Sequence, residues 1–128
     1  MWSPVDATRV GLTVRTIPSA NDILDLELQL QADDCSFQPL KDGWQGKLDV
    51  WLVQLGPGDE LLDTVSHITD VRLTGPSLQR MRRTGELVLM ERLKRARKAV
   101  LIRVLVRDVA TGALGSVSIP LDRVVLDR

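Results

Sequence analysis

Few residues in this chain belong to the types that carry out covalent or acid–base chemistry. The 128-residue sequence has one cysteine, Cys35, and one histidine, His67. A thiol–imidazole nucleophilic site needs these two side chains in hydrogen-bond contact, and no motif in the sequence places them together. A metal centre would have to be built around the same single histidine. We therefore expect Cys35 to be a small buried thiol and His67 to be a half-exposed strand residue, in a chain that is not an enzyme.

Acidic residues cluster at Asp33-Asp34 and at Asp59-Glu60 with Asp63. Glycoside hydrolysis uses two carboxyl groups held about 5 to 9 Å apart across a cleft, and calcium takes six or more oxygen ligands. Neither cluster has the spacing of a calcium-binding loop, and Gly56-Pro57-Gly58 lacks the lysine and the following helix of a phosphate-binding loop. We interpret these segments as solvated turns and predict no catalytic residue, metal ligand or cofactor.

Basic residues are concentrated in the second half of the chain. Residues 1–70 hold four cations against twelve anions and residues 71–128 hold thirteen cations against five anions, although the net charge is zero. If strands from the two halves interleave in space, these charges pair across the surface. The steepest part, residues 80–98, also fits the pattern of a polyanion site, where lysine and arginine neutralise phosphates or sulfates. The candidate contact residues for a polyanion or an acidic partner are Arg80, Arg82, Arg83, Lys94, Arg95, Arg97 and Lys98.

Strand patterns that would position these residues are clearest in residues 24–31 and 100–121. In the first segment four leucines alternate with acids and amides, which is the period of a strand with one solvated face. In the second, the branched residues at 100, 102, 104 and 106 point one way and Arg103 and Arg107 the other. Thr111-Gly112 then supplies the positive φ that a short hairpin needs.

Other strands are predicted at about residues 8–16, 47–55, 61–73 and 86–93. The segment 47–55 is apolar on both faces and is therefore expected at the centre of a sheet. Residues 33–46 are expected to form a loop. Pro76 begins a short helical turn, with Leu78 and Met81 inward and Gly85 at its end.

About seven short strands with one short helical turn are typical of an all-β, immunoglobulin-like antiparallel sandwich. A jelly roll or a small barrel is the alternative. The length suits a single domain over residues 1–128, with residues 1–7 as a lead-in and residues 122–128 as a tail. A tyrosine corner and a disulfide between sheets are absent from the sequence, so Trp44 or Trp51 is expected to take the core tryptophan position. No apolar run approaches the ~20 residues that span a bilayer, so no membrane span is expected.

Two stretches carry a resemblance to a known family. Residues 43–50, Gly-Trp-Gln-Gly-Lys-Leu-Asp-Val, precede a Gly-Pro-Gly loop, and residues 103–121 contain Val-Arg-Asp, Thr-Gly, Gly-Ser and Pro-Leu at fixed offsets. These motifs resemble the C-terminal region of bacterial VWFA-related proteins, in which a von Willebrand factor A domain lies upstream. The Asp-x-Ser-x-Ser metal-adhesion motif of that upstream domain is absent here, so no metal-binding residue is carried over.

The resemblance implies a non-catalytic accessory module of a larger, exported bacterial protein, extracellular or periplasmic, that supports an adhesion-type domain. The chain has no secretion signal of its own, so this location rests on the resemblance. Its expected partner is a protein or the adjacent von Willebrand A-type domain, and the sheet edge containing Pro120 is one candidate for β-augmentation. A module that binds polyanions or carbohydrate through residues 80–98 is the alternative. The sequence leaves the oligomeric state open.

Overall fold

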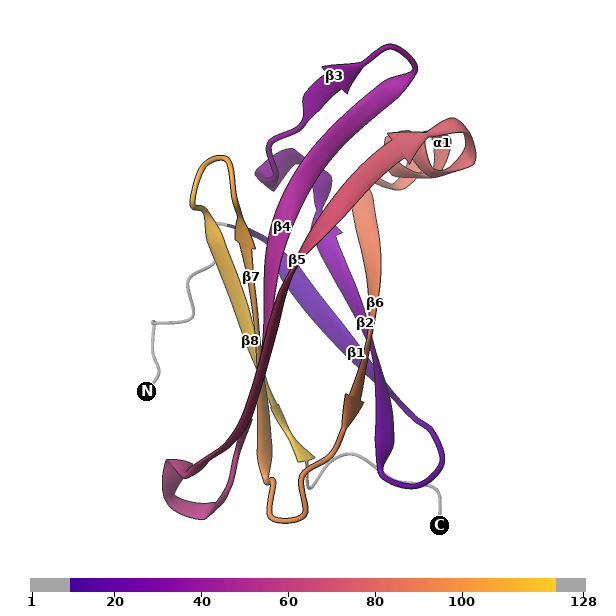
Figure 1. The fold of residues 1–128 in the computed structure, drawn as a ribbon. Coiled ribbons are helices and arrows are strands. Elements are labelled where there is room, and N and C mark those ends of the chain that lie inside the picture. The colour runs from indigo at the N-terminus through magenta and orange to yellow at the C-terminus, as the bar shows by residue number, and fades with distance from the viewer. Residues whose placement is uncertain (1–9, 122–128) are drawn as a thin grey trace.

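A computed structural model describes residues 10–121, which form two antiparallel β-sheets packed face to face with one helix at one end (Figure 1). The predicted all-β, immunoglobulin-like sandwich is confirmed, with eight strands in these residues instead of about seven. The predicted lead-in and tail lie outside the described residues. The strands are β1 (Leu12–Pro18), β2 (Ile23–Gln31), β3 (Gln38–Leu40), β4 (Gly43–Leu55), β5 (Leu61–Thr74), β6 (Glu86–Lys94), β7 (Leu101–Asp108) and β8 (Leu114–Pro120). The helical elements are η1 (Ala32–Asp34), η2 (Pro57–Asp59) and α1 (Gly75–Thr84).

The smaller sheet has the strand order β1-β2-β6. The four alternating leucines of β2 are fully buried, as their period predicts. On the outer face, Arg92 Nε donates to Asp25 Oδ1 at 2.8 Å, and the Arg15 guanidinium lies 2.6 Å from Glu27. The hydrogen bond from Arg92 lowers the pKa of the Asp25 carboxyl. The Asp25–Arg92 pair joins the acidic half of the chain to the basic half, so strands from the two halves do interleave.

In the larger sheet β4 is the central strand, as its apolar character on both faces predicts. β5 pairs along one side of β4, and β7 and the short β3 pair along the other, with β8 outside β7. Leu48, Val50 and Leu52 of β4 point into the core. The ladder between β4 and β5 shifts register between Gln54 and Leu55, which agrees with the irregular pattern of residues 61–73.

Some sequence predictions are corrected by the structure. Residues 38–40 form β3 inside the expected loop, and β4 begins at Gly43 instead of at about Lys47, because its first residues pair with β3 and with the end of β5. Val100 precedes β7 and is 48% exposed instead of buried. Trp44 packs against the core, whereas Trp51 faces outward and is 40% exposed.

The helix α1 closes one end of the sandwich and follows the predicted pattern. Thr74 and Ser77 form a reciprocal capping box, Pro76 lies in the first turn, and Gly85 ends the helix with φ of 74°. Leu78 is buried and Met81 packs against the core. Among residues 10–121 no helix is long and apolar enough to cross a membrane.

The two long sides of the sandwich differ. On one side the Val10 N–H donates to the Leu114 carbonyl oxygen at 3.3 Å, and β1 contacts β8. On the other side β5 and β6 are the last strands of their sheets, and neither has a second strand partner within the described part of the chain. Figure 1 shows both strands meeting α1 at one end of this side.

Candidate functional site

The seven predicted contact residues fall into two groups at opposite ends of the sandwich, so they do not form one continuous patch (Figure 1). Arg80, Arg82 and Arg83 lie on α1. The second group lies at the end of β6 and directly after it, and consists of Lys94, Arg95, Arg97 and Lys98. The first eight residues of β6, 86–93, separate the groups, which is about 26 Å of extended chain. None of the seven side chains forms an ion pair with another residue in the range 10–121.

The turn that carries the second group is held by a buried amide. Gln54 is 1% exposed, its Nε2 donates to the Lys94 carbonyl oxygen at 3.0 Å, and its Oε1 accepts from the Ala96 N–H at 2.7 Å. The Arg95 N–H donates to the Asp22 carbonyl oxygen at 2.8 Å. The cations of this turn therefore project from a fixed backbone. Beside it lies a hollow of about 690 Å³, lined by Asp22, Gln54, Leu62, Asp63, Lys94, Arg95, Ala96 and Arg97.

The middle of β6, residues 87–90, is apolar on both faces, and the charged Glu86, Glu91, Arg92 and Lys94 lie on either side of it. The inward Leu87 and Leu93 of β6 are buried, but the outward Val88 and Met90 are 45% and 57% exposed. In the same sheet, the outward positions of β2 carry acids and amides. Edge strands that face water usually carry charges or are covered by other chain. The exposed Val88 and Met90 therefore form a short apolar centre on this edge, between charged residues.

The centre of β5 is also exposed. Residues 64–69 contain no Lys, Arg, Asp or Glu, and Ile68 on the outer face is 60% exposed. Val65 is 43% exposed although it pairs with Leu52 and so points to the core side. The His67 side chain, opposite Val50, is 42% exposed in the same way. Both are uncovered because, within residues 10–121, the smaller sheet ends at β6 and has no further strand to lie over them.

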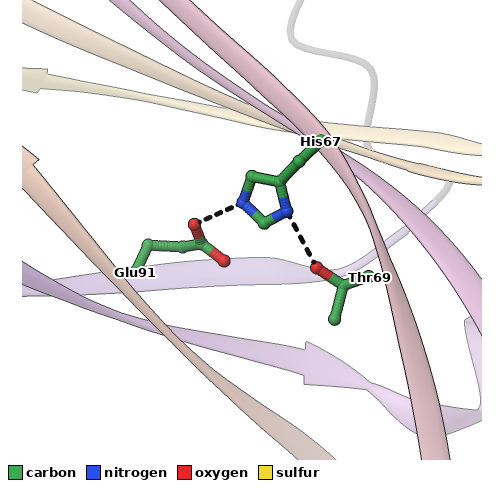
Figure 2. A network of polar contacts seen from close by, with 3 residues as sticks. All are labelled: His67, Thr69 and Glu91. Atoms are coloured by element: carbon green, nitrogen blue, oxygen red, sulfur yellow. Dashed lines mark hydrogen bonds and ion pairs between the residues drawn. The ribbon is translucent and has the colours of Figure 1, made fainter.

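A polar contact between side chains bridges the two unpaired strands. Figure 2 shows His67 of β5 reaching Glu91 of β6, with 2.7 Å between Nε2 and Oε1. His67 Nδ1 lies 3.2 Å from the Thr69 hydroxyl oxygen. Hydroxyl, imidazole and carboxylate in this order are the components of a nucleophilic triad. A pocket that held His67 together with a further carboxylate, Asp63 or Asp70, would support an enzymatic interpretation. These two aspartates line two different hollows, and His67 lines neither of them.

Cys35 lies apart from this network. Its Sγ donates to the Gln31 carbonyl oxygen at 3.7 Å, and burial raises the pKa of its thiol to about 11. His67 hydrogen-bonds Glu91 and Thr69 instead of the thiol. Among residues 10–121 no three His, Cys, Asp or Glu side chains are grouped so that they could hold a metal ion.

Two hollows flank the His67–Glu91 contact along β5 and β6. The hollow at the α1 end has a volume of about 260 Å³, and the 690 Å³ hollow lies at the basic turn. On both β5 and β6, the residues nearest α1 line the α1 hollow, the next form the His67–Glu91 contact, and those farthest from α1 line the turn hollow. We call this surface the open side: the unpaired edges of β5 and β6 with the exposed Val65, Ile68, Val88 and Met90. The α1 hollow is lined by Asp70, Val71, Arg72, Leu73, Ser77, Arg80, Met81, Glu86, Leu87, Val88 and Leu89.

The cations at both ends of the open side are predicted from the sequence, whereas the exposed apolar residues between them are not. The apolar run at residues 87–90 was the available signal. The other predicted edge, β8 with Pro120, is an edge strand of the larger sheet, but β1 contacts it near Leu114.

Comparisons with known proteins add little to this geometry. No protein-family model matches the chain, and no curated protein matches it. Fifteen chains of solved structures match, among them a calcium binding mutant of Bacteroides uniformis beta-glucuronidase 2. That match has 11% sequence identity and a TM-score of 0.43, and covers 84% of this chain and 12% of that chain. The chain thus spans about an eighth of that protein's length, and the likeness carries no functional argument.

Proposed function

We propose that this domain is a non-catalytic interaction module that binds an extended segment of a protein partner along its open side. One observation carries the proposal. Eight large apolar side chains are exposed among the described residues, and five of them lie on β5 and β6. Unpaired apolar edges favour strand addition, in which backbone hydrogen bonds give affinity and alternate side chains give specificity. The five are Leu61, Val65, Ile68, Val88 and Met90.

Site-specific photo-crosslinking in the native cell tests this proposal. A photoreactive amino acid replaces Met90 on the open side or Val109, an exposed apolar residue outside β5 and β6. We expect a discrete crosslinked protein from position 90 and none from position 109. Equal crosslinking at both positions, or none at position 90, would contradict the proposal.

Residues 43–50 and 103–121 support a setting for the module through their resemblance to VWFA-related proteins. In that setting the domain lies C-terminal to a von Willebrand A-type domain in an exported bacterial protein, and the partner is that domain or a separate protein. An antibody against this chain, followed by mass spectrometry of the captured product, tests the setting. A larger product with upstream Asp-x-Ser-x-Ser peptides would support it, and a product of this length would remove it.

A second candidate function is polyanion or carbohydrate binding, favoured by the seven cations that lack an ion pair within residues 10–121. Such binding is strong at low salt and falls steeply as salt rises. Retention on a heparin column that disappears at moderate salt is expected. Charge reversal of Arg82 and Arg83, compared with reversal of Lys94 and Arg97, identifies which end binds. Absence of retention at low salt would exclude this function.

A further inference from the structure

We infer that the occupant of the open side is a strand of about nine residues, apolar at its centre and acidic at both ends, which adds to the unpaired edge of β6. This inference rests on the proposed function and specifies the chemistry of the partner. It joins two observations that the sequence left separate, the apolar edge and the divided basic residues.

The widths of the two sheets select β6 as the edge that is extended. Across its width the larger sheet runs β5, β4, β7 and β8, whereas the smaller sheet has only β1, β2 and β6 in residues 10–121. The sheets meet where β1 contacts β8, so the smaller sheet falls one strand short at β5. A strand added to β6 would lie over Val65 and His67, whose positions in the ladder point to the core side. A strand added to β5 would leave both side chains uncovered.

The centre of this surface requires an uncharged segment. Val88 and Met90 are exposed on the outer face of β6, and Val65 is exposed on the inner face of β5. Glu91, whose side chain is only 11% exposed, already has His67 as its partner. On the inner face, a charge at the middle of the added strand would be placed against Val65 and this closed pair, and would lose hydration without gaining a partner.

Additional cations lie beside both hollows of the open side. The α1 hollow is lined by two cations and two anions with two further arginines on α1, and the turn hollow is lined by three cations and two anions with one further lysine after them. Acidic residues at the two ends of the occupant would therefore complement both ends of the edge. Arg72, Arg80, Asp70 and Glu86 line the α1 hollow, and Arg82 and Arg83 lie further along α1. Lys94, Arg95, Arg97, Asp22 and Asp63 line the turn hollow, Lys98 follows them, and Asp59 and Glu60 directly precede β5 at this end.

A peptide of defined sequence tests the inference on the full chain. The probe is a nine-residue peptide with valine and threonine alternating at its centre and two aspartates at each end, and the matched control has lysine in place of aspartate. At low salt we expect the acidic peptide to bind at least about tenfold more tightly, with the difference shrinking as salt rises. Equal affinity of the two peptides, or failure of both to bind, would overturn the inference.

The binding mode is tested by methyl spectra and backbone methylation. The methyl signals of Val65 and Val88 should shift on binding, whereas those of the exposed Val100 and Val109 should not. N-methylation at alternate peptide positions should abolish binding in one frame and spare it in the other, because only one set of amides faces the ladder. Loss in both frames or in neither would overturn strand addition.

Two charge-reversal variants separate this inference from the proposed function. Lys94→Glu with Arg97→Glu should weaken the acidic peptide about tenfold or more. Arg103→Glu with Arg107→Glu, on the outer face of β7, should not. If Met90 crosslinks a partner in cells while these variants bind the acidic peptide equally, the proposed function stands and the acidic occupant is wrong.

Discussion

At the scale of single residues, partial burial lowers the reactivity of the Cys35 thiol. Burial is the main cause of the raised Cys35 pKa of about 11, and the nearby carboxylates of Asp108 and Asp34 add to it. At pH 8 this thiol has about a hundredfold smaller thiolate fraction than a thiol at the ordinary pKa of 9.0. We expect iodoacetamide to alkylate the folded chain about a hundredfold more slowly than the chain unfolded in urea. Similar rates in the two states would contradict this prediction.

The same shift makes folding stability depend on pH in the alkaline range. The folded state holds the Cys35 proton more tightly than the unfolded state. Ionisation of Cys35 therefore leaves the free energy of unfolding unchanged below about pH 9 and lowers it as pH rises toward about 11. Urea unfolding at pH 8 and at pH 10.5 should show this loss for the natural chain. Cys35→Ser should show less of it, and an equal loss in both proteins would assign the effect to other groups.

Gln54 is a second residue whose burial carries a prediction. Its amide satisfies both the Lys94 carbonyl and the Ala96 N–H. Gln54→Leu keeps the volume but leaves these backbone groups without their partner, and it should lower the free energy of unfolding by about 2 kcal/mol. Gln79→Leu on the exposed face of α1 is the control, with little change expected. Urea denaturation measures both, and equal stability of the two variants would show that the buried amide is dispensable.

At the scale of elements, the basic turn between β6 and β7 depends on backbone contacts more than on its charges. Arg95 contributes one side-chain hydrogen bond, from Nη2 to the Ala99 carbonyl oxygen at 3.3 Å, and Arg97 is exposed. Arg95→Glu with Arg97→Glu should therefore cost only about 1 kcal/mol and leave thermal unfolding cooperative. Circular dichroism across the melting transition tests this. A broad, non-cooperative melt would show that the charges themselves hold the turn.

Elements defined by local signals could be predicted from the sequence. The alternating leucines of β2 and the Pro76 and Gly85 boundaries of α1 depend only on neighbours in the chain. β3 could not be predicted, because three residues including Pro39 become a strand only by pairing with the start of β4. The same limit applies to β6, since an apolar run such as residues 87–90 is also typical of a central strand. Its edge position depends on the non-local strand order.

The candidate site was predicted in its composition but not in its shape. The exposed cations of residues 80–98 could be identified because charge patterning is a property of the sequence alone. Whether they gather depends on the direction of β6, which runs from α1 to the basic turn and carries the two groups to opposite ends. The open side between them required knowing which strands lack a neighbour.

At the scale of the whole molecule, one long side of the sandwich is closed by contact between β1 and β8 while the other is open and apolar. Without a partner, two unpaired apolar edges should lead copies of the chain to associate. We expect sedimentation velocity to show association that increases with protein concentration. Met90→Lys with Ile68→Lys should suppress it, because charges on edge strands oppose edge-to-edge pairing. Both side chains are more than half exposed, so the double variant should unfold at nearly the same urea concentration as the natural chain.

The control variant, Val100→Lys with Val109→Lys, changes as many exposed apolar residues away from β5 and β6, and it should leave association unchanged. If this second pair suppresses association as strongly as the first, the open side is not the surface that joins the copies. If the natural chain stays monomeric at every concentration, the charged residues on either side of the apolar centre of β6 are enough to protect the edge, and the case for an absent strand partner weakens.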